Sequence, residues 1–318
     1  MLDPNGIYEV DPQVERLVQH AGTGTGPVLV HSMQGFVDAG RAGRVATEHL
    51  LNELSSDRLV TFDIDQLLDY RSRRPAMTFE ARTWSEYDEP ELVVDLLRDD
   101  VGMPFLLLHG LEPDVQWERW VAAVRTLVER FEVPLTVGIE GIPMGIPHTR
   151  PTSVTAHATR ATLVAGHNTS WIGTVQVPAS AAALLELRLG QSGHDAMGFS
   201  VHVPNYLAQT ACPSAGIAAL EQVERVTGLQ LRTSGLLPAA ERAVAEVERQ
   251  VAEAPDVAAV VHGLEEQYDA FIRGVGRPGL LAGGDLPTAE ELGAEFERFL
   301  AAQGGPADAA DGQAASQG

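Results

Sequence analysis

Short apolar runs alternate with amphipathic segments along most of the chain. Apolar runs bounded by Gly, Pro or charged residues predict strands at 27–32, 59–64, 104–108, 134–139, 170–178 and 198–204, with a further extended segment at 77–84. Apolar residues spaced by three and four predict helices over 40–54, 116–131 and 178–189. Because strands and helices alternate, the pattern predicts an α/β fold with a single parallel or mixed sheet covered by helices on both faces.

The pattern changes after about Ser234, where no strand-like run remains. Apolar stripes at helical spacing predict a C-terminal helical appendage, with helices over 240–251, 257–271 and 288–300. The last residues contain no large apolar side chain, so burial cannot offset the entropy of ordering them. We therefore predict three parts: an α/β domain at 1–234, a helical region at 235–302 and a disordered tail at 303–318.

The charge balance and the residue types exclude several functions. The chain has 44 Asp and Glu against 22 Lys and Arg, a formal net charge of −22 that repels nucleic acid and anionic membranes. Every basic residue is arginine, which excludes a P-loop, a Schiff base and a kinase-type lysine. Cys212 is the single cysteine, so no intrachain disulfide or multi-cysteine metal site can form. No signal-peptide pattern is found. We expect a cytoplasmic protein without metal or cofactor.

Candidate ligand-binding residues follow the first predicted strand. Gln34, Gly35 and Asp38 come after it, and glycines 40 and 43 lead into a helix. Ligands of open α/β sheets bind beyond the carboxyl ends of the strands, and backbone N–H groups at a helix N-terminus hold anions. The loop is therefore a candidate anion site. Alternatively, its glycines only permit a tight turn and close helix packing.

A second polar cluster follows the strand predicted at 104–108. His109, Glu112 and Asp114 supply an imidazole and two carboxylates, and Glu112 is a candidate ligand-binding residue. These groups perform acid–base chemistry or bind a divalent cation. Alternatively, the cluster is a turn in which Asp114 caps the following helix.

The segment 138–157 is rich in proline and glycine and follows another predicted strand. It presents Glu140, His148 and Arg150 on a stiff loop. An arginine can hold a carboxylate or phosphate with two hydrogen bonds, and a histidine can move a proton near neutral pH. Alternatively, the loop lies at an oligomer interface with Arg150 paired to an acidic residue across it.

Two further positions complete the candidate site. Asn205 follows the last predicted strand and is a candidate ligand-binding residue, whereas Ser180 is interpreted as a helix N-cap because no nucleophile-elbow motif surrounds it. His157 lacks metal-ligand spacing and is given no role. Since parallel strands end on one side of a sheet, we predict that these loops converge on one crevice with Arg150 as its main anion contact. The candidate catalytic residues are His148, Glu140, His109 and Asp114.

Four blocks of sequence occur in an order that resembles the proteasome assembly chaperone family, most closely its actinobacterial branch. The blocks are HSMQGFVDAGRAG, LLLHGLEPDVQWERW, GIEGIPMGIPHTRPTSVTAHAT and VPASAAALLELRLGQSGHDAMGFSVHVPNYLAQTACPSAG, and the resemblance covers about residues 24–230. It implies a single α/β domain similar to that of purine nucleoside phosphorylases. It also implies one of two activities, since eukaryotic relatives are non-catalytic chaperones of the proteasome α-ring and a carboxylate–amine ligase activity has been suggested for prokaryotic relatives.

Our leading hypothesis is a non-catalytic protein-assembly or protein-interaction factor that forms a homo-oligomer, with a trimer as one candidate, and retains a small-ligand crevice. The absence of lysine argues against the ligase activity. The alternative hypothesis is an enzyme that acts on a nucleoside, nucleotide or other small anion, as a nucleosidase or phosphorylase does. The sequence identifies neither the substrate nor the protein partner.

Overall fold

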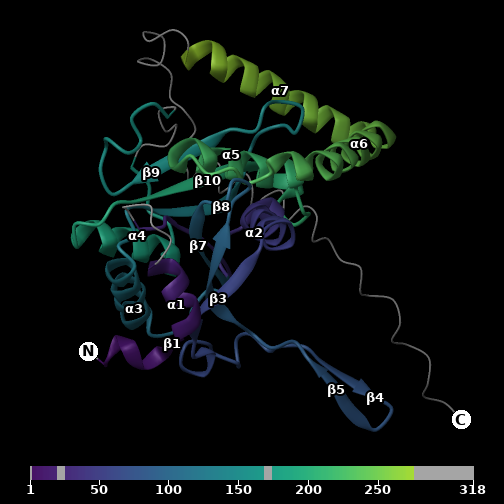
Figure 1. Ribbon diagram of the computed structural model, residues 1–318. Helices are drawn as coiled ribbons and strands as arrows, with labels where there is room; N and C mark the ends of the chain where they lie inside the picture. The colour runs from purple at the N-terminus through teal and green to yellow at the C-terminus, as the bar shows by residue number, and fades with distance from the viewer. Residues whose placement is uncertain (1, 20–25, 168–173, 276–318) are drawn as a thin grey trace, which may run out of the picture. The chain divides into compact units, whose positions relative to one another are not determined.

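One eight-stranded mixed sheet organises the computed structural model of the protein, which describes residues 2–19, 26–167 and 174–275 (Figure 1). The strand order across the sheet is β1 (Tyr8–Val10), β3 (Ser56–Phe62), β6 (Leu92–Arg98), β7 (Pro104–Leu111), β2 (Leu29–Gln34), β8 (Thr136–Met144), β10 (Ala196–Pro204) and β9 (Val154–Ala158). The strands β7, β2, β8 and β10 are parallel, and the outer strands pair antiparallel. The predicted mixed sheet is thereby confirmed.

Helices cover both faces of this sheet, as predicted. One face packs against α1 (Pro12–Gln19), α3 (Trp117–Arg130) and α4 (Ala181–Gln191), and the other against α2 (Ala42–Glu53) and α5 (Pro213–Thr227). Short 3-10 segments lie at Pro4–Ile7, Ala39–Arg41, Ile64–Gln66, Asn205–Leu207 and Thr233–Leu236. The apolar stripe of α3, including Trp120 and Val124, is buried in the first of the two cores because its residues recur at helical spacing.

Several elements are missing from the sequence-based prediction. The most important is β6, whose apolar run is interrupted by Asp95. In the structure Asp95 is buried and bonded on both sides, since Arg58 Nε lies 2.6 Å from Oδ1 and His109 Nε2 lies 2.9 Å from Oδ2. Burial raises the pKa of Asp95, but the hydrogen bonds and charges of His109 and Arg58 outweigh it and lower the pKa overall. A carboxylate that looked incompatible with a buried strand is therefore accommodated by its two partners.

Two other predicted extended segments differ from the structure. Residues 174–178 form no strand, so the strand predicted at 170–178 is wrong there, and residues 170–173 lie outside the described residues. The segment at 77–84 is one arm of a separate hairpin, which consists of β4 (Met77–Glu80) and β5 (Thr83–Tyr87). The hairpin extends away from the large sheet (Figure 1).

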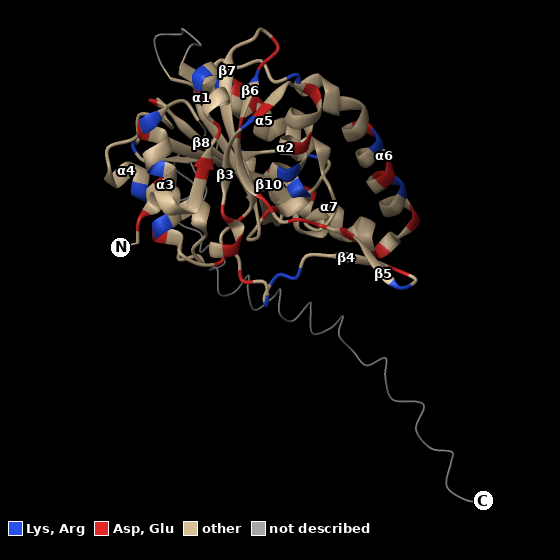
Figure 2. Ribbon diagram, turned by 60° about the horizontal axis from the view of Figure 1, so that its bottom comes forward, with Lys and Arg blue, Asp and Glu red and all other residues tan. Residues whose placement is uncertain are grey.

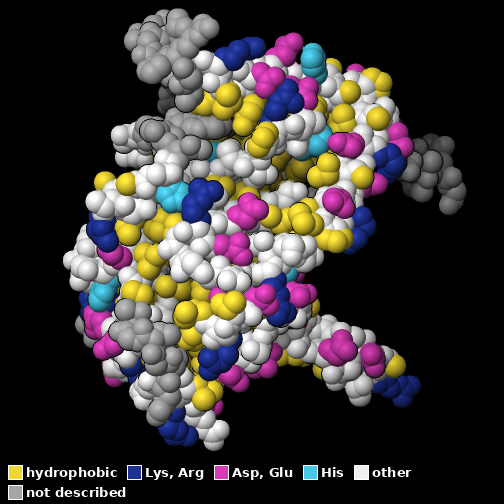
Figure 3. Space-filling view, turned by 45° about the horizontal axis from the view of Figure 1, so that its top comes forward, with side chains coloured by type: hydrophobic (Ala, Val, Ile, Leu, Met, Phe, Trp, Pro, Cys, Tyr) yellow, Lys and Arg dark blue, Asp and Glu magenta, His cyan; other side chains and the backbone are white. Residues whose placement is uncertain are grey.

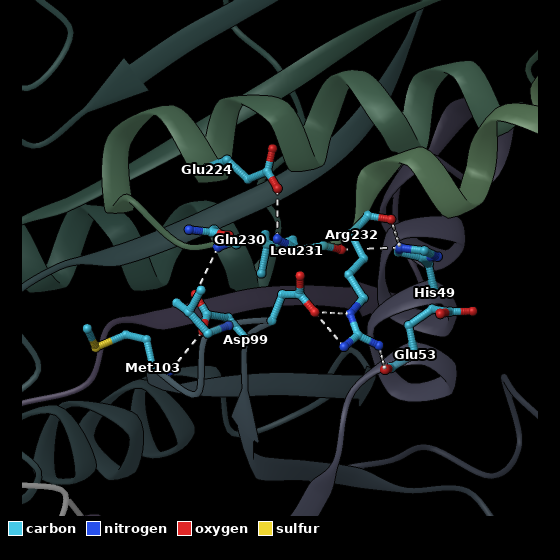
Figure 4. Close-up of polar contacts among 10 residues, drawn as sticks. His49, Glu53, Asp99, Met103, Glu224, Gln230, Leu231 and Arg232 are labelled. Carbon is cyan, nitrogen blue, oxygen red and sulfur yellow. Dashed lines mark hydrogen bonds and ion pairs between the residues drawn. The ribbon is translucent and has the colours of Figure 1, made fainter.

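The segment that follows α5 is held to the sheet by a polar network (Figure 4). Asp99, in the turn between β6 and β7, accepts hydrogen bonds from the backbone N–H groups of Gln230 at 2.9 Å and Met103 at 2.7 Å. His49 Nε2, on α2, lies 3.0 Å from the carbonyl oxygen of Arg232. These contacts satisfy backbone groups of a segment without regular structure, and they fix where the C-terminal helices begin.

The C-terminal region is helical in its described part, with α6 at Leu237–Glu253 and α7 at Pro255–Val275. No strand follows Ser234 in the described residues. The chain divides into compact units at 1–265 and 266–318, so α6 belongs to the unit that contains the sheet. The three-part division of the sequence analysis stays a prediction. The helix predicted at 288–300 and the tail at 303–318 lie outside the described residues.

Candidate functional site

Two histidines face each other across the parallel strands. The backbone register places His31 of β2 beside Gly138 of β8, Gly138 beside Gly198 of β10, and Gly198 beside His157 of β9. The imidazole rings occupy the space above the glycines, since a Cβ atom on Gly138 would lie 2.8 Å from Cε1 of His31, and one on Gly198 would contact the ring of His157 still more closely. Only glycine at these two positions leaves room for both rings.

Carboxylates surround the two rings. The Nδ1 atom of His157 lies 2.8 Å from Oε2 of Glu186, which α4 places over this face of the sheet. On the neighbouring strands, the hydroxyl of Ser200 donates a 3.0 Å hydrogen bond to Oε1 of Glu140. A small cavity of about 60 Å³ lies among His31, His157, Glu140 and Glu186. It sits over the parallel strands and under α4, above the positions of His31, Gly138 and Gly198.

The surroundings shift the pKa values of the groups around this cavity in different directions. Burial lowers the pKa of His31 to about 4, so this imidazole is neutral near pH 7. Burial raises the pKa of Glu140 overall, although the hydrogen bond from Ser200 and the charge of His157 lower it in part. For His157 burial lowers the pKa, but the hydrogen bond and charge of Glu186 outweigh this and raise it overall. The cavity therefore combines a neutral imidazole, an ion pair and the half-buried carboxyl group of Glu140.

The predicted anion site after β2 is filled by the protein's own carboxylate. Asp38 Oδ1 accepts hydrogen bonds from the N–H groups of Gly43 at 2.9 Å and Gly141 at 3.0 Å, and its Oδ2 accepts one from the N–H of Arg44 at 3.1 Å. Asp38 thus holds the N-terminus of α2 and connects it to β8. The expectation of backbone N–H groups at a helix N-terminus was right, but the anion that they bind is internal.

Glu112 has a similar role at the N-terminus of α4. Its Oε1 accepts a 2.6 Å hydrogen bond from the N–H of Ala181 at the start of α4, and burial raises its pKa. Ser180 accepts a hydrogen bond from the N–H of Ala183 at 3.1 Å, which confirms its predicted role as an N-cap. Asp114 does not cap α3 as the alternative interpretation proposed. It instead accepts from the N–H of Asp69.

The remaining residues predicted near this crevice make structural contacts. Arg73 lies 2.7 Å from Oδ1 of Asp114, and its guanidinium donates to the carbonyl oxygen of Gln34 and packs against Gly35. His109 is buried and bonded to Asp95 within the sheet. Of the predicted residues, Asp38, Glu112 and Glu140 line the small cavity.

Arg150 and His148 lie elsewhere, so the prediction of a single crevice is wrong for them. They line a second cavity of about 260 Å³ between the proline-rich loop and α6, together with Tyr206. The Nδ1 atom of His148 lies 2.8 Å from the hydroxyl of Tyr206, and Arg150 pairs with Glu265 of the same chain at 3.2 Å. Arg150 therefore has an acidic partner within its own chain. Asn205 begins a 3-10 turn and lines neither of these two cavities.

The sequence analysis missed His31, His157 and Glu186. Two short sequences carried a signal, because Gly138-Ile139-Glu140 and Gly198-Phe199-Ser200 repeat the order glycine, apolar, polar on adjacent strands. In the described residues, no group of three or more His, Cys, Asp or Glu side chains is arranged to hold a metal ion. Within the same ranges no helix is both long and apolar enough to cross a membrane.

Comparison with known proteins places this chain in one family. The model of the PAC2 family matches residues 32–251, and the chain belongs to that family. No functionally curated protein matches the chain.

Three solved structures are informative relatives. The chain is similar to Rv2714 of Mycobacterium tuberculosis, a protein of unknown function, with 47% identity, coverage of 94% of this chain and 96% of that one, and a TM-score of 0.79. A protein of unknown function from Corynebacterium glutamicum has 34% identity over 84% of this chain and 98% of that one, with a TM-score of 0.77. The proteasome-assembly chaperone homologue Rv2125 of Mycobacterium tuberculosis has 25% identity over 74% of this chain and 99% of that one, with a TM-score of 0.66. The resemblance drawn from the sequence is thus confirmed at the level of the family.

Proposed function

We propose that this protein is a non-catalytic, cytoplasmic assembly factor that forms a homo-oligomer, binds a further protein through its β4–β5 hairpin and retains a small-ligand crevice. Membership of the PAC2 family and the similarity to a proteasome-assembly chaperone homologue support this function. Subunits of a proteasome α-ring are accordingly the first partners to test.

The observation that carries the proposal is the exposed apolar surface of the hairpin. Met77, Phe79, Trp84 and Tyr87 are 52%, 56%, 65% and 46% exposed, and the rings of Phe79 and Trp84 contact each other with centroids 4.9 Å apart and planes tilted by 57°. A two-stranded hairpin on its own is marginally stable in water, and clustered exposed aromatics mark binding sites on soluble proteins. In the space-filling view the hairpin projects from the neighbouring surface (Figure 3). We infer that a partner covers these side chains.

The charges beside the hairpin indicate the chemistry of that partner. Arg71, Arg74 and Arg82 form no ion pair with any residue that the structure describes. Basic residues appear in the segment that leads into β4 and at the tip of the hairpin, although acidic residues predominate in the chain as a whole (Figure 2). An apolar depression with an acidic rim on the partner would complement both features.

The size of the crevice argues against the alternative of a nucleosidase or phosphorylase. Its volume is about 60 Å³, whereas pockets for drug-sized ligands measure roughly 300–1,000 Å³. The arginine expected to hold a phosphate lies in the other cavity and is paired with Glu265. The helix N-terminus expected to hold the anion is capped by Asp38.

The test is a binding measurement with purified mycobacterial proteasome α-subunits. We expect the full chain to bind them and the double variant Phe79→Ser, Trp84→Ser to bind at least about tenfold more weakly, because central aromatics dominate interface energies. Leu187→Ser on α4 is the matched control, since Leu187 is apolar and 53% exposed. All variants should melt at the wild-type temperature. Absence of wild-type binding would contradict the proposed partner, and equal binding by the double variant would contradict the role of the hairpin.

A further inference from the structure

His31 is a buried polar side chain that lacks a partner. It is 5% exposed, its ring lines the small cavity, and no hydrogen bond joins it to any residue that the structure describes. A neutral imidazole has one donor and one acceptor nitrogen, and the protein does not fully enclose either nitrogen of His31. A polar group that enters the cavity can therefore reach His31 and form a hydrogen bond with it.

The carboxylates around the cavity define the charge of that group. Asp38 and Glu112 are already satisfied by backbone N–H groups, and Glu186 is paired with His157. Glu140 accepts only a neutral hydroxyl hydrogen bond, from Ser200. Neither arginine nor lysine lines this cavity within the described residues. Four carboxylates therefore line the cavity against the single charge of His157, and a positively charged ligand would reduce this excess of negative charge.

The hydrogen-bond acceptors of the cavity narrow the class of ligand further. An acceptor is available on each of three groups: the second oxygen of Glu140, the second oxygen of Glu186, and the imidazole nitrogen of His31. An alkylammonium ion carries three N–H donors and no acceptor. We propose that the crevice binds a primary ammonium group, with Glu140 and Glu186 as its charged acceptors and His31 as its neutral acceptor. This inference rests on the proposed small-ligand crevice but not on the hairpin.

The cavity volume limits the part of the ligand that enters. A water molecule needs roughly 10–15 Å³ of comparable volume, so about 60 Å³ holds an ammonium group and a few carbon atoms. Met33 and Phe199 supply apolar lining for such a stem. The group can belong to a free small amine or to a lysine side chain of a partner protein. A second copy of this chain cannot supply such a side chain, because the sequence contains no lysine.

The test is calorimetric titration of the full chain with propylammonium chloride. We expect a dissociation constant of about a millimolar or tighter, within the range that a handful of ligand atoms allows. Tetramethylammonium, which has the charge but no N–H donor, and propionate, which has the opposite charge, should produce no saturable heat. No saturable heat with propylammonium, or equal binding of tetramethylammonium, would overturn the proposal.

Two variants and one control locate the site. Glu140→Gln and Glu186→Gln should each weaken propylammonium binding at least tenfold, and Glu248→Gln on α6 removes the same charge from an exposed position and should leave it unchanged. Thermal melting shows whether each variant is folded. If one variant does not fold, the affinity of the other variant tests the site. Unchanged affinity for propylammonium in a folded variant contradicts the role of that carboxylate as an acceptor.

A second titration, with a peptide, distinguishes the two sources of the amine. The peptide contains one lysine with a free side chain and is acetylated at its N-terminus. If it binds as tightly as propylammonium, the ligand is a lysine of a partner protein. If only propylammonium binds, the ligand is a free amine. Because the hairpin variants retain the whole crevice, they should bind propylammonium normally. Failure of amine binding and failure of α-subunit binding are therefore separate results.

Discussion

Replacing Asp38 with alanine tests whether this carboxylate holds α2 to the sheet. The substitution removes the acceptor of three backbone N–H groups, those of Gly43, Arg44 and Gly141. Gly43 and Arg44 belong to the first turn of α2, and Gly141 lies in β8 and is buried. Water can reach the exposed Arg44 end of this arrangement but not the N–H of Gly141.

The expected loss of stability has two parts. Removing a helix N-cap costs about 0.5–2 kcal/mol, and leaving a buried N–H without an acceptor costs about 1–3 kcal/mol. Asp38→Ala should therefore lower the free energy of unfolding by roughly 2–4 kcal/mol. Asp38→Asn keeps one carbonyl oxygen for Gly43 and Gly141, so we expect a smaller loss of about 1 kcal/mol.

Urea denaturation followed by circular dichroism measures both variants, with unchanged slopes required for the comparison. Sulfate provides an independent readout, because the vacated helix N-terminus should bind it. Sulfate at ten times its dissociation constant should restore about 1.4 kcal/mol to Asp38→Ala, relative to sodium chloride at equal ionic strength. Wild-type protein should show no such gain. A loss below about 0.5 kcal/mol in Asp38→Ala, or equal sulfate effects in both proteins, would refute the role assigned to Asp38.

Three further results are expected. The pKa of His31 is lowered to about 4 in the folded protein, so the unfolded chain binds a proton that the folded protein does not, and stability falls as the pH drops from about 6.5 toward 4. His31→Gln should reduce this fall by up to about 3 kcal/mol in urea titrations at successive pH values, and an unchanged pH profile would contradict it. Asp95→Ala leaves buried His109 and half-exposed Arg58 without their acceptor and should cost about 3 kcal/mol of unfolding free energy, whereas a loss below 1 kcal/mol would show that the pair contributes little. Sedimentation should give a mass above the 34.0 kDa of one chain, and a monomer at micromolar concentration would exclude the proposed homo-oligomer.

Much of the fold could be predicted from local sequence patterns. The alternation of strands and helices, the strand at 104–108, the helix at 116–131 and the helical region after Ser234 were read correctly because a buried face repeats with the period of its own element. Ser180 was recognised as an N-cap because capping depends on residues only three positions apart. β6 was missed because its burial of Asp95 depends on partners from two other strands.

The candidate site was also predicted only in part from the sequence. The sequence placed polar residues at the ends of strands, and Asp38, Glu112 and Glu140 do line one cavity. It did not reveal that Asp38 and Glu112 are helix caps, since their N–H donors include residues such as Gly141 and Ala181 that are far away along the chain. Arg150 likewise has its acidic partner, Glu265, 115 residues later.

The sequence by itself determined the composition, the absence of lysine, the net charge of −22 and the periodicities that specify an α/β fold of the family. Only the tertiary structure brought His31 and His157 to face each other over Gly138 and Gly198. Their meeting depends on β2, β8, β10 and β9 being neighbours in that order and in one register. Local periodicity reports which side of a strand is buried, but it carries no information about which distant strand pairs with it, because that choice is made by the packing of the whole sheet.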